Sequence, residues 1–422
     1  MALATELDLG DAHADITDHD VYTRGVPHAT FLRLRKEDPV SFTEEADGRG
    51  FWSVTRYEDV LYVSRHTELF SSARGIRLED MDDEECEARR TIMEMDPPQH
   101  SRYRRLVSRP FSPRAVAEYE TSVRDLAREV LAEVRGEARF EFVSRVARQL
   151  PMKMLGRLLG LPDEDLNWLV DRGDALIGNT DADFTDFVVD QVDTTDYRLL
   201  PFRSPVSLEL FEFAEVALAA RRAKPTNDVL TSLLQPTVDG DLLDDDQLKN
   251  FFTLMVAAGN DTTRYSMAAG LKALAERPAL LTTLQEDPAA IRTTVDEMLR
   301  WSSTTMHFRR TATQDTELRG TNIRAGDKVV VWYVSADFDD EQFSDPFHFD
   351  ALRSPNDHVA FGLHSPHLCL GAHLARLEMR VLFEELVPML RSIEVAEPPE
   401  RLRSNFISGL KRLEVGASWR NT

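Results

Sequence analysis

The sequence is poor in cysteine, with only Cys86 and Cys369 among its 422 residues. A disulfide framework or a metal site built from several thiolates needs more thiols, so both are excluded. The two cysteines lie far apart in the chain, and Cys86 falls in an acidic run, EDMDDEECEARR. One disulfide is the most that they could form.

Long apolar runs and an excess of positive charge are also missing. No apolar stretch approaches the roughly 20 residues of a membrane helix. The acidic N-terminal sequence lacks the basic and apolar regions of a signal peptide. Acidic residues number 73 and basic residues 50, which gives a formal charge of −23 and opposes nucleic-acid binding. We therefore expect a cytoplasmic protein with no membrane anchor and no nucleic-acid partner.

The patterns that are present indicate a helical protein. Apolar residues make up 42% of the chain, enough for a large core. Helical patterns fill most of the chain from Ser112 to Val295. Short β-like runs occur at Phe51 to Ser64, at Asp327 to Ser335 and near the end. Regular βαβ alternation is missing. The pattern predicts a mainly α fold with small β-sheets, in a single domain spanning residues 1–422.

The longest predicted helix runs from Asp244 to Pro278. Asp244 and Gln247 have the spacing of a capping box, and the middle of the helix is apolar on all sides, so it should cross the core. The apolar part ends in GNDTT, residues 259–263. A glycine costs about 1 kcal/mol inside a helix, and a buried acid costs more unless it is paired. The segment is either a kink or polar turn, or a gap beside a ligand.

Cys369 precedes another predicted helix. Gly362 and Pro366 indicate a tight loop before it, and a helical pattern begins near Gly371. Free amides at a helix N-terminus stabilise a thiolate. Taken alone, Cys369 suits a buried core position better than a ligand role. With its neighbours, a lone thiolate fits an axial haem ligand better than a zinc or iron–sulfur site.

Five motifs occur in a recognisable order. The loop FGLHSPHLCLG contains Phe361, Gly362, His367, Cys369 and Gly371. The second motif is AGNDTT, residues 258–263, and the third is EMLR with Glu297 and Arg300, to which Arg353 is added. The fourth is the stretch with His100 and Arg104, and the fifth is RRTATQD with Arg310. Together they resemble the cytochrome P-450 family of soluble bacterial haem-thiolate monooxygenases over essentially the whole chain. The resemblance implies the P-450 fold, a long central helix over a buried haem b (iron protoporphyrin IX).

The resemblance also implies roles for these residues. Cys369 would be the iron ligand, and His100, Arg104, Arg310 and His367 would bind the haem propionates. Glu297, Arg300 and Arg353 would form a buried network behind the cysteine loop, although spacing alone would suit a surface salt bridge. Gly259 would leave room for O2, Thr262 would hold a water by hydrogen bond, and Asp261 would relay protons. The reaction would insert one oxygen atom into a C–H bond.

The electrons for this reaction must come from outside the chain. No Gly-x-Gly-x-x-Gly fingerprint follows a predicted strand. The implied partners are a ferredoxin and a ferredoxin reductase that uses NAD(P)H. Ferredoxins tend to be acidic, so a basic docking face is expected. The arginines predicted to form it are Arg102, Arg105, Arg109, Arg376 and Arg380.

The cysteine loop departs from the commonest family pattern. Seven residues separate Phe361 from Cys369, one more than usual, and the usual second glycine is replaced within LHSP. His364, Ser365 or Pro366 must therefore accept a different backbone path. This spacing, with AGNDTTR and HFRRTA, resembles the branch that hydroxylates sterol side chains, methyl-branched lipids or terpenoids.

We therefore expect a large apolar substrate. The predicted pocket residues are Met255, Ala258, Thr304, Thr305, His307, Phe406 and Ile407. Residues 181–196 are predicted to form a lid. Two alternatives stay open: hydroxylation of a polyketide or another secondary metabolite, and a haem-binding sensor without turnover. The pair Asp261 and Thr262 argues against a sensor, which needs no proton delivery.

Overall fold

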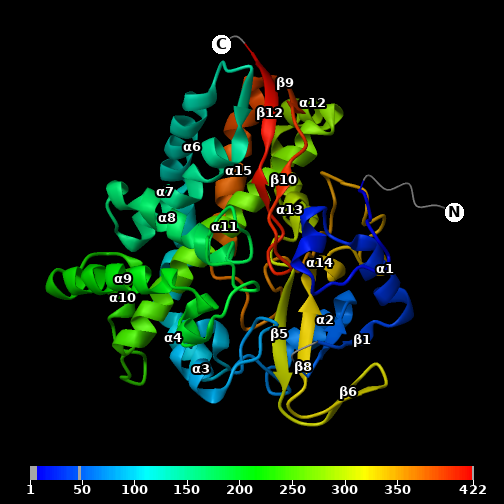
Figure 1. The fold of residues 1–422 in the computed structure, drawn as a ribbon. Coiled ribbons are helices and arrows are strands. Elements are labelled where there is room, and N and C mark those ends of the chain that lie inside the picture. The colour runs from blue at the N-terminus through cyan, green and yellow to red at the C-terminus, as the bar shows by residue number, and fades with distance from the viewer. Residues whose placement is uncertain (1–6, 46–48, 421–422) are drawn as a thin grey trace.

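Helices dominate the computed structural model, which describes residues 7–45 and 49–420. They surround one long central helix, α11 (Asp245–Ala275), which packs against α7, α8, α9 and α13 (Figure 1). The predicted capping box is confirmed: the Asp244 side chain accepts from the Gln247 amide, and the Gln247 side chain accepts from the Asp244 amide. Packing on so many sides explains why the middle of this helix is apolar all round.

The other helices lie before and after α11 in the chain, and the larger ones pack along it or behind the cysteine loop. They are α1 (His28–Glu37), α2 (Tyr57–Arg65), α3 (Asp83–Ala88), α4 (Gln99–Ser108), α5 (Pro113–Glu118), α6 (Glu120–Val134), α7 (Gln149–Leu159), α8 (Asp163–Ile177), α9 (Val206–Ala223), α10 (Val229–Leu233), α12 (Pro278–Glu286), α13 (Ile291–Ser302), α14 (Tyr333–Ala336) and α15 (Ala372–Met389). Within residues 7–45 and 49–420, no helix has the length and apolar character needed to span a bilayer.

The strands form small sheets. The largest has the order β1-β2-β8-β5-β3, antiparallel except between β2 and β8. Its strands are β1 (Val40–Thr43), β2 (Phe51–Val54), β8 (Lys328–Trp332), β5 (His307–Ala312) and β3 (Phe70–Ser71). The smaller sheets pair β4 (Arg139–Glu141), β12 (Glu414–Trp419) and β9 (Leu390–Val395); β10 (Glu400–Arg401) and β11 (Leu410–Arg412); and β6 (Thr316–Leu318) and β7 (Thr321–Ile323).

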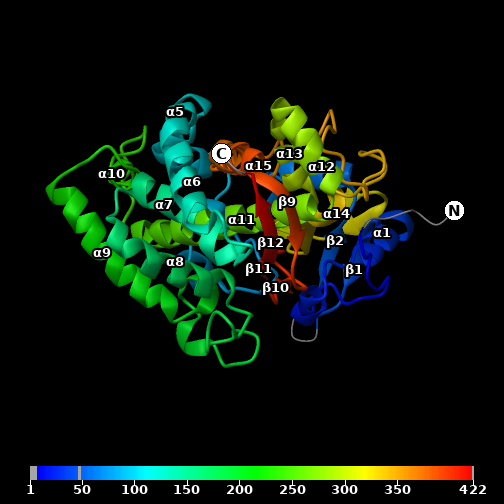
Figure 2. The ribbon, with the colours of Figure 1, turned by 90° about the horizontal axis from the view of Figure 1, so that it is seen from above.

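The large sheet and the helical layer occupy different sides of the molecule. Strands β1, β5 and β8 lie with α1 and α2 on one side, and α6 to α10 lie on the other (Figure 1). The view from above shows the same division, with α11 running between them (Figure 2). The predicted mainly α fold with small β-sheets is confirmed.

Two local predictions differ from the structure. The run from Phe51 to Ser64 is a strand only as far as Val54, and α2 follows it. Tyr57, Val60 and Val63 are spaced three residues apart and buried, so helical packing overrides their β propensity. The strand predicted to reach Ser335 ends at Trp332. There the backbone turns into α14, where Ser335 donates to the Thr55 carbonyl at 2.8 Å.

Candidate active site

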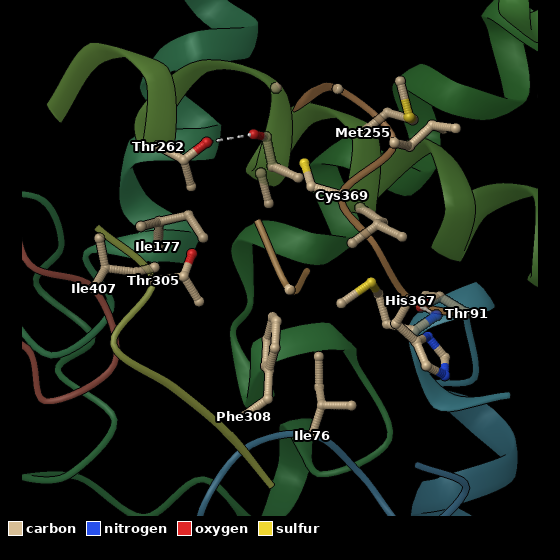
Figure 3. A pocket seen from close by; sticks show the side chains of 18 of the residues that line it. Ile76, Thr91, Ile177, Met255, Thr262, Thr305, Phe308, His367, Cys369 and Ile407 are labelled. Atoms are coloured by element: carbon tan, nitrogen blue, oxygen red, sulfur yellow. Dashed lines mark hydrogen bonds between the residues drawn. The ribbon is translucent and has the colours of Figure 1, made fainter. Parts of the chain in front are cut away.

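A cavity of about 320 Å³ lies between α11 and the loop that precedes α15. We call it the active-site cavity. Figure 3 shows Met255 and Thr262 from α11, Cys369 and His367 from the loop, and Phe308 from β5 around the same space. The chain thus brings three segments that are distant in sequence to one place.

Cys369 lines this cavity at the start of α15. Its backbone N–H donates to the Phe361 carbonyl at 2.8 Å, which closes the loop. The amides of Gly371 and Ala372 lie beside the sulfur at the predicted helix start, and the Ala372 amide donates to the Cys369 carbonyl at 3.3 Å. Burial raises the pKa of the Cys369 thiol, whereas these amides and Arg104 oppose that rise. A metal cation at the sulfur would favour the thiolate. Both Cys86 and Cys369 are free thiols, so no disulfide links them.

The loop before Cys369 takes two left-handed turns. Gly362 has a φ of 71°, and His364 has a φ of 62° where the usual second glycine is absent. Histidine tolerates this region better than β-branched residues do, although less well than glycine. His364 is therefore the residue that accepts the unusual backbone path.

Positively charged and unsatisfied groups gather at one edge of the cavity. The rings of His100 and His367 lie 4.2 Å apart between centroids. Among the described residues, the two ring nitrogens of His100 have no hydrogen-bond partner. The buried Nε of Arg310 has none either. Burial, followed by the charge of Arg104, lowers the pKa of His100 to about 4, so this ring is neutral at pH 7.

These orphaned donors fit the acid groups of a ligand. Buried N–H groups are normally paired, and a carboxylate would satisfy them with charge-assisted hydrogen bonds. Arg104 already donates to the Leu368 carbonyl, which ties this edge to the cysteine loop. A haem with its two propionates requires a thiolate ligand for the iron and a cluster of basic side chains for the carboxylates. The thiol at the start of α15 and the cluster around His100 and Arg310 have these properties. The residues present therefore fit a haem.

Helix α11 presents one face to the cavity. Met255, Ala258, Gly259 and Thr262 all line it at helical spacing. The helix is unbroken here, and the Thr262 hydroxyl donates to the Ala258 carbonyl at 3.1 Å. A methyl group at Gly259 would lie 2.9 Å from Leu155 Cδ1 of α7, which lines the same cavity. Glycine therefore allows α7 and α11 to approach closely at this point, and of the alternatives left open for this segment the kink is not observed.

Asp261 points away from the cavity into a buried ion cluster. Its Oδ1 lies 3.0 Å from Arg264 Nη2 and accepts from Asn260 Nδ2 at 3.1 Å. Arg264 also donates to Asp174 of α8 at 2.8 Å. Burial raises the pKa of Asp261 well above its ordinary value, and the charge of Arg264 opposes this. Asp174 lies 3.5 Å from Arg148, whose other partner, Asp171, is exposed, so the cluster extends towards solvent.

Glu297, Arg300 and Arg353 form the buried network behind the cysteine loop. Arg300 makes two hydrogen bonds to Glu297, at 2.7 and 2.8 Å, and Arg353 Nε donates to the same carboxylate at 3.0 Å. Asn356 and the Asp350 amide also donate to Glu297. The side chains of Glu297 and Arg300 are fully buried. Arg300 Nη1 donates to the carbonyls of residues 337 and 346, so the network joins α13 to the segment that leads to the loop.

Six of the seven predicted pocket residues line the cavity: Met255, Ala258, Thr304, Thr305, Phe406 and Ile407. The structure does not bring His307 there. Side chains alternate along β5, so Phe308 faces the cavity while His307 stacks on Trp332 at 4.8 Å and lines a neighbouring cavity. Residues 181–196 are tied to the C-terminal segment, through Arg403 to Asp190 and through Lys411 to Asp181.

Two charged residues, Glu378 and Arg77, are among the cavity residues that the sequence did not predict. Glu378 of α15 is buried and lines the cavity, and burial raises its pKa to about 8, so the acid is mostly protonated at pH 7. Arg77 lies in the loop after β3 and also lines the cavity. The signal for Glu378 is an acid within an otherwise apolar helix face. The signal for Arg77 is a basic residue between the apolar residues Ile76 and Leu78.

Comparisons with known proteins agree with this geometry. A family model described as cytochrome P450 matches residues 19–409. A methyl-branched lipid omega-hydroxylase of Mycobacterium tuberculosis is 36% identical over 420 residues, covering 97% of this chain and 95% of that protein. A steroid C26-monooxygenase of the same species is 35% identical, covering 95% and 92%. The structure of a Mycobacterium marinum cytochrome P450 in complex with pseudoionone has a TM-score of 0.86 at 35% identity, covering 97% of this chain and 100% of that one. The chain belongs to the cytochrome P450 family of monooxygenases.

Proposed function

We propose that this monooxygenase hydroxylates a large, mostly apolar substrate of the sterol, methyl-branched lipid or terpenoid class. The observation that carries the proposal is the active-site cavity, which places apolar side chains from α11, β5 and the C-terminal segment opposite Cys369. The names of the relatives, a methyl-branched lipid hydroxylase and a steroid monooxygenase, support the same class.

The cofactor in this proposal is haem b. When bound, haem activates O2 so that one oxygen atom enters a C–H bond while the other leaves as water, with two electrons and two protons consumed. Cys369 would bind the iron, with Phe361 and Gly371 closing the loop around it. His100, Arg104, Arg310 and His367 would bind the propionates.

Thr262 and Asp261 are proposed to supply protons. Thr262 faces the cavity with a hydroxyl that can hold a water, and Gly259, which packs against Leu155, lies on the same face of the helix. Asp261 lies next to Thr262 in sequence but faces the cluster with Arg264 and Asp174, so it would pass protons from the solvent side.

Replacing Thr262 with alanine should uncouple electron use from product formation. The variant keeps the helix and the haem site but loses the hydroxyl that holds the proton-delivering water. We expect electron consumption to continue while product per electron falls by about tenfold or more. Product and NAD(P)H consumption are measured together, with Thr263→Ala as the matched neighbour. Unchanged coupling in the Thr262 variant would refute this role.

A separate ferredoxin with its NAD(P)H-dependent reductase is proposed to supply the electrons. Of the five arginines predicted for docking, Arg102, Arg376 and Arg380 are held in ion pairs with this chain's own acids. Arg105 of α4 and Arg109, which directly follows this helix, are exposed. These two arginines are the better candidates for contact with an acidic partner.

A spectral titration tests the substrate class. Purified haem-loaded protein is titrated with sterols, terpenoids, methyl-branched fatty acids and macrolides, and the haem absorption band is followed as water leaves the iron. We expect saturable shifts with the first three classes and turnover of the responders. A response confined to macrolides would replace the proposal with hydroxylation of a polyketide.

A further inference from the structure

Arg77 lies in the wall between two cavities. The loop between β3 and α3 carries it, and it lines both the active-site cavity and a second cavity of about 200 Å³. The two cavities also share Glu79, Phe202 and Phe406 in their linings. A group that extends from the active-site cavity towards the second one would therefore meet Arg77.

The Arg77 guanidinium is held between two aromatic rings. Its Cζ lies 5.0 Å from the ring centroid of Phe202 and 5.1 Å from that of Phe406. The adjacent backbone is anchored, because the Arg309 amide donates to the Ile76 carbonyl at 2.8 Å. Within the described part of the chain, no carboxylate or carbonyl forms a hydrogen bond with this guanidinium. Its donors are therefore available to a ligand.

The ring beneath Arg77 is positioned by a strained turn. Phe202 and Arg203 both have positive φ values, 59° and 49°, which non-glycine residues rarely adopt. The Phe202 carbonyl accepts from Asn179 at 3.2 Å, and Arg203 donates to Glu85 at 2.8 Å, so the surroundings hold the turn in place. Strain of this kind persists where it serves a site.

Arg77 also lies in a cluster with one positive charge in excess. Arg89 and Arg203 share Glu79, at 3.1 and 3.6 Å, and Arg203 also pairs with Glu85. Two carboxylates thus serve three arginines. Burial, together with the charges of Arg89 and Arg203, lowers the pKa of Arg77, while Glu79 opposes this. An additional anion at Arg77 would balance the cluster.

The second cavity has polar groups in its lining as well as apolar side chains. His307 is 1% exposed and lines it, and among the described residues neither of its ring nitrogens has a partner. The acid Asp190 in the lining is already bound by two hydrogen bonds from Arg403, at 3.1 and 2.9 Å. The cavity can therefore accept a polar, anionic group.

We propose that Arg77 and the second cavity bind the carboxylate at one end of an otherwise apolar substrate, whose other end lies towards Cys369. The planar guanidinium fork suits two parallel hydrogen bonds to a carboxylate. The inference rests on the proposed function and narrows its substrates to long-chain, branched or steroidal carboxylic acids. It also orients them, with the C–H bond to be oxidised remote from the acid.

Matched acids and alcohols test this inference by spectral titration of the haem-loaded protein. The pairs are isostearic acid with isostearyl alcohol, and lithocholic acid with its side-chain alcohol. We expect the wild type to bind each acid about tenfold or more tightly than its alcohol. Arg77→Gln should weaken acid binding about tenfold or more and leave alcohol binding within about twofold, and Arg77→Lys should retain part of the preference.

The matched control is Arg74→Gln, because Arg74 lies in the same loop but pairs with exposed Asp83 outside both cavities. It should leave both affinities unchanged. Equal binding of acids and alcohols by the wild type would overturn the inference and leave the proposed function standing, and so would an Arg77→Gln variant that weakens both equally. A wild type with intact haem that responds to none of these apolar probes would overturn both.

Discussion

Replacing Cys369 with serine should abolish both monooxygenase activity and the spectrum of thiolate-bound haem. A serine hydroxyl at this position ionises far less readily than a thiol and binds iron differently, so the electron donation that favours O–O cleavage is lost. The reduced, carbon monoxide-bound spectrum and product formation are measured together. The helix start at Gly371 and the surrounding loop remain, so the polypeptide should still fold.

The other cysteine supplies the control for this experiment. Cys86 is a buried free thiol of α3, distant in sequence from the loop. Cys86→Ala should keep the thiolate spectrum. Persistence of that spectrum in the Cys369→Ser protein, or its loss in the Cys86 variant alone, would contradict the assignment of the iron ligand.

Replacing Glu297 with glutamine should cause the largest loss of stability. Glutamine has nearly the same shape but leaves Arg300 and Arg353 buried without a counter-charge. Breaking a buried pair in this way costs about 3–5 kcal/mol, because the remaining charge is uncompensated. We expect a much lower thermal unfolding midpoint and reduced haem content, since the network connects α13 to the segment leading to Cys369.

A surface ion pair provides the comparison. Glu209 of α9 pairs with Arg172 of α8 at 2.7 Å, but the Glu209 side chain is 47% exposed. Glu209→Gln should change stability by about 1 kcal/mol or less. Similar unfolding midpoints for the two glutamine variants would show that the Glu297 network does not stabilise the protein.

Features that depend on neighbours in the chain were predictable. The capping box of Asp244 and Gln247 and the start of α15 behind Cys369 each involve residues within a few positions of one another. The resemblance of five ordered motifs added the fold and a candidate for every main role. Six of the seven predicted pocket residues line the cavity, although the pairing that brings Thr305 next to Ile407 is a long-range contact without a local signal.

Features that depend on partners far away in the chain were not predictable. Tyr57 to Arg65 has β-forming residues, yet packing beneath the large sheet makes it a helix. His307 was expected in the pocket, but the direction of β5 turns it into the second cavity. The pairing of Arg264 with Asp174 of α8, 90 residues earlier, also has no local signal.

By itself, the sequence determined the family, the long central helix and the placement of Cys369 at a helix start, because short-range spacing and capping carry that information. The tertiary structure alone decided which donors remain unsatisfied. Within residues 7–45 and 49–420, the His100 ring and Arg310 Nε have no hydrogen-bond partner, and Arg77 lies between two rings without an acceptor. A buried donor is left without an acceptor only when segments distant in sequence pack around it and none of them supplies one. Such unpaired donors therefore identify where the acidic groups of a ligand bind.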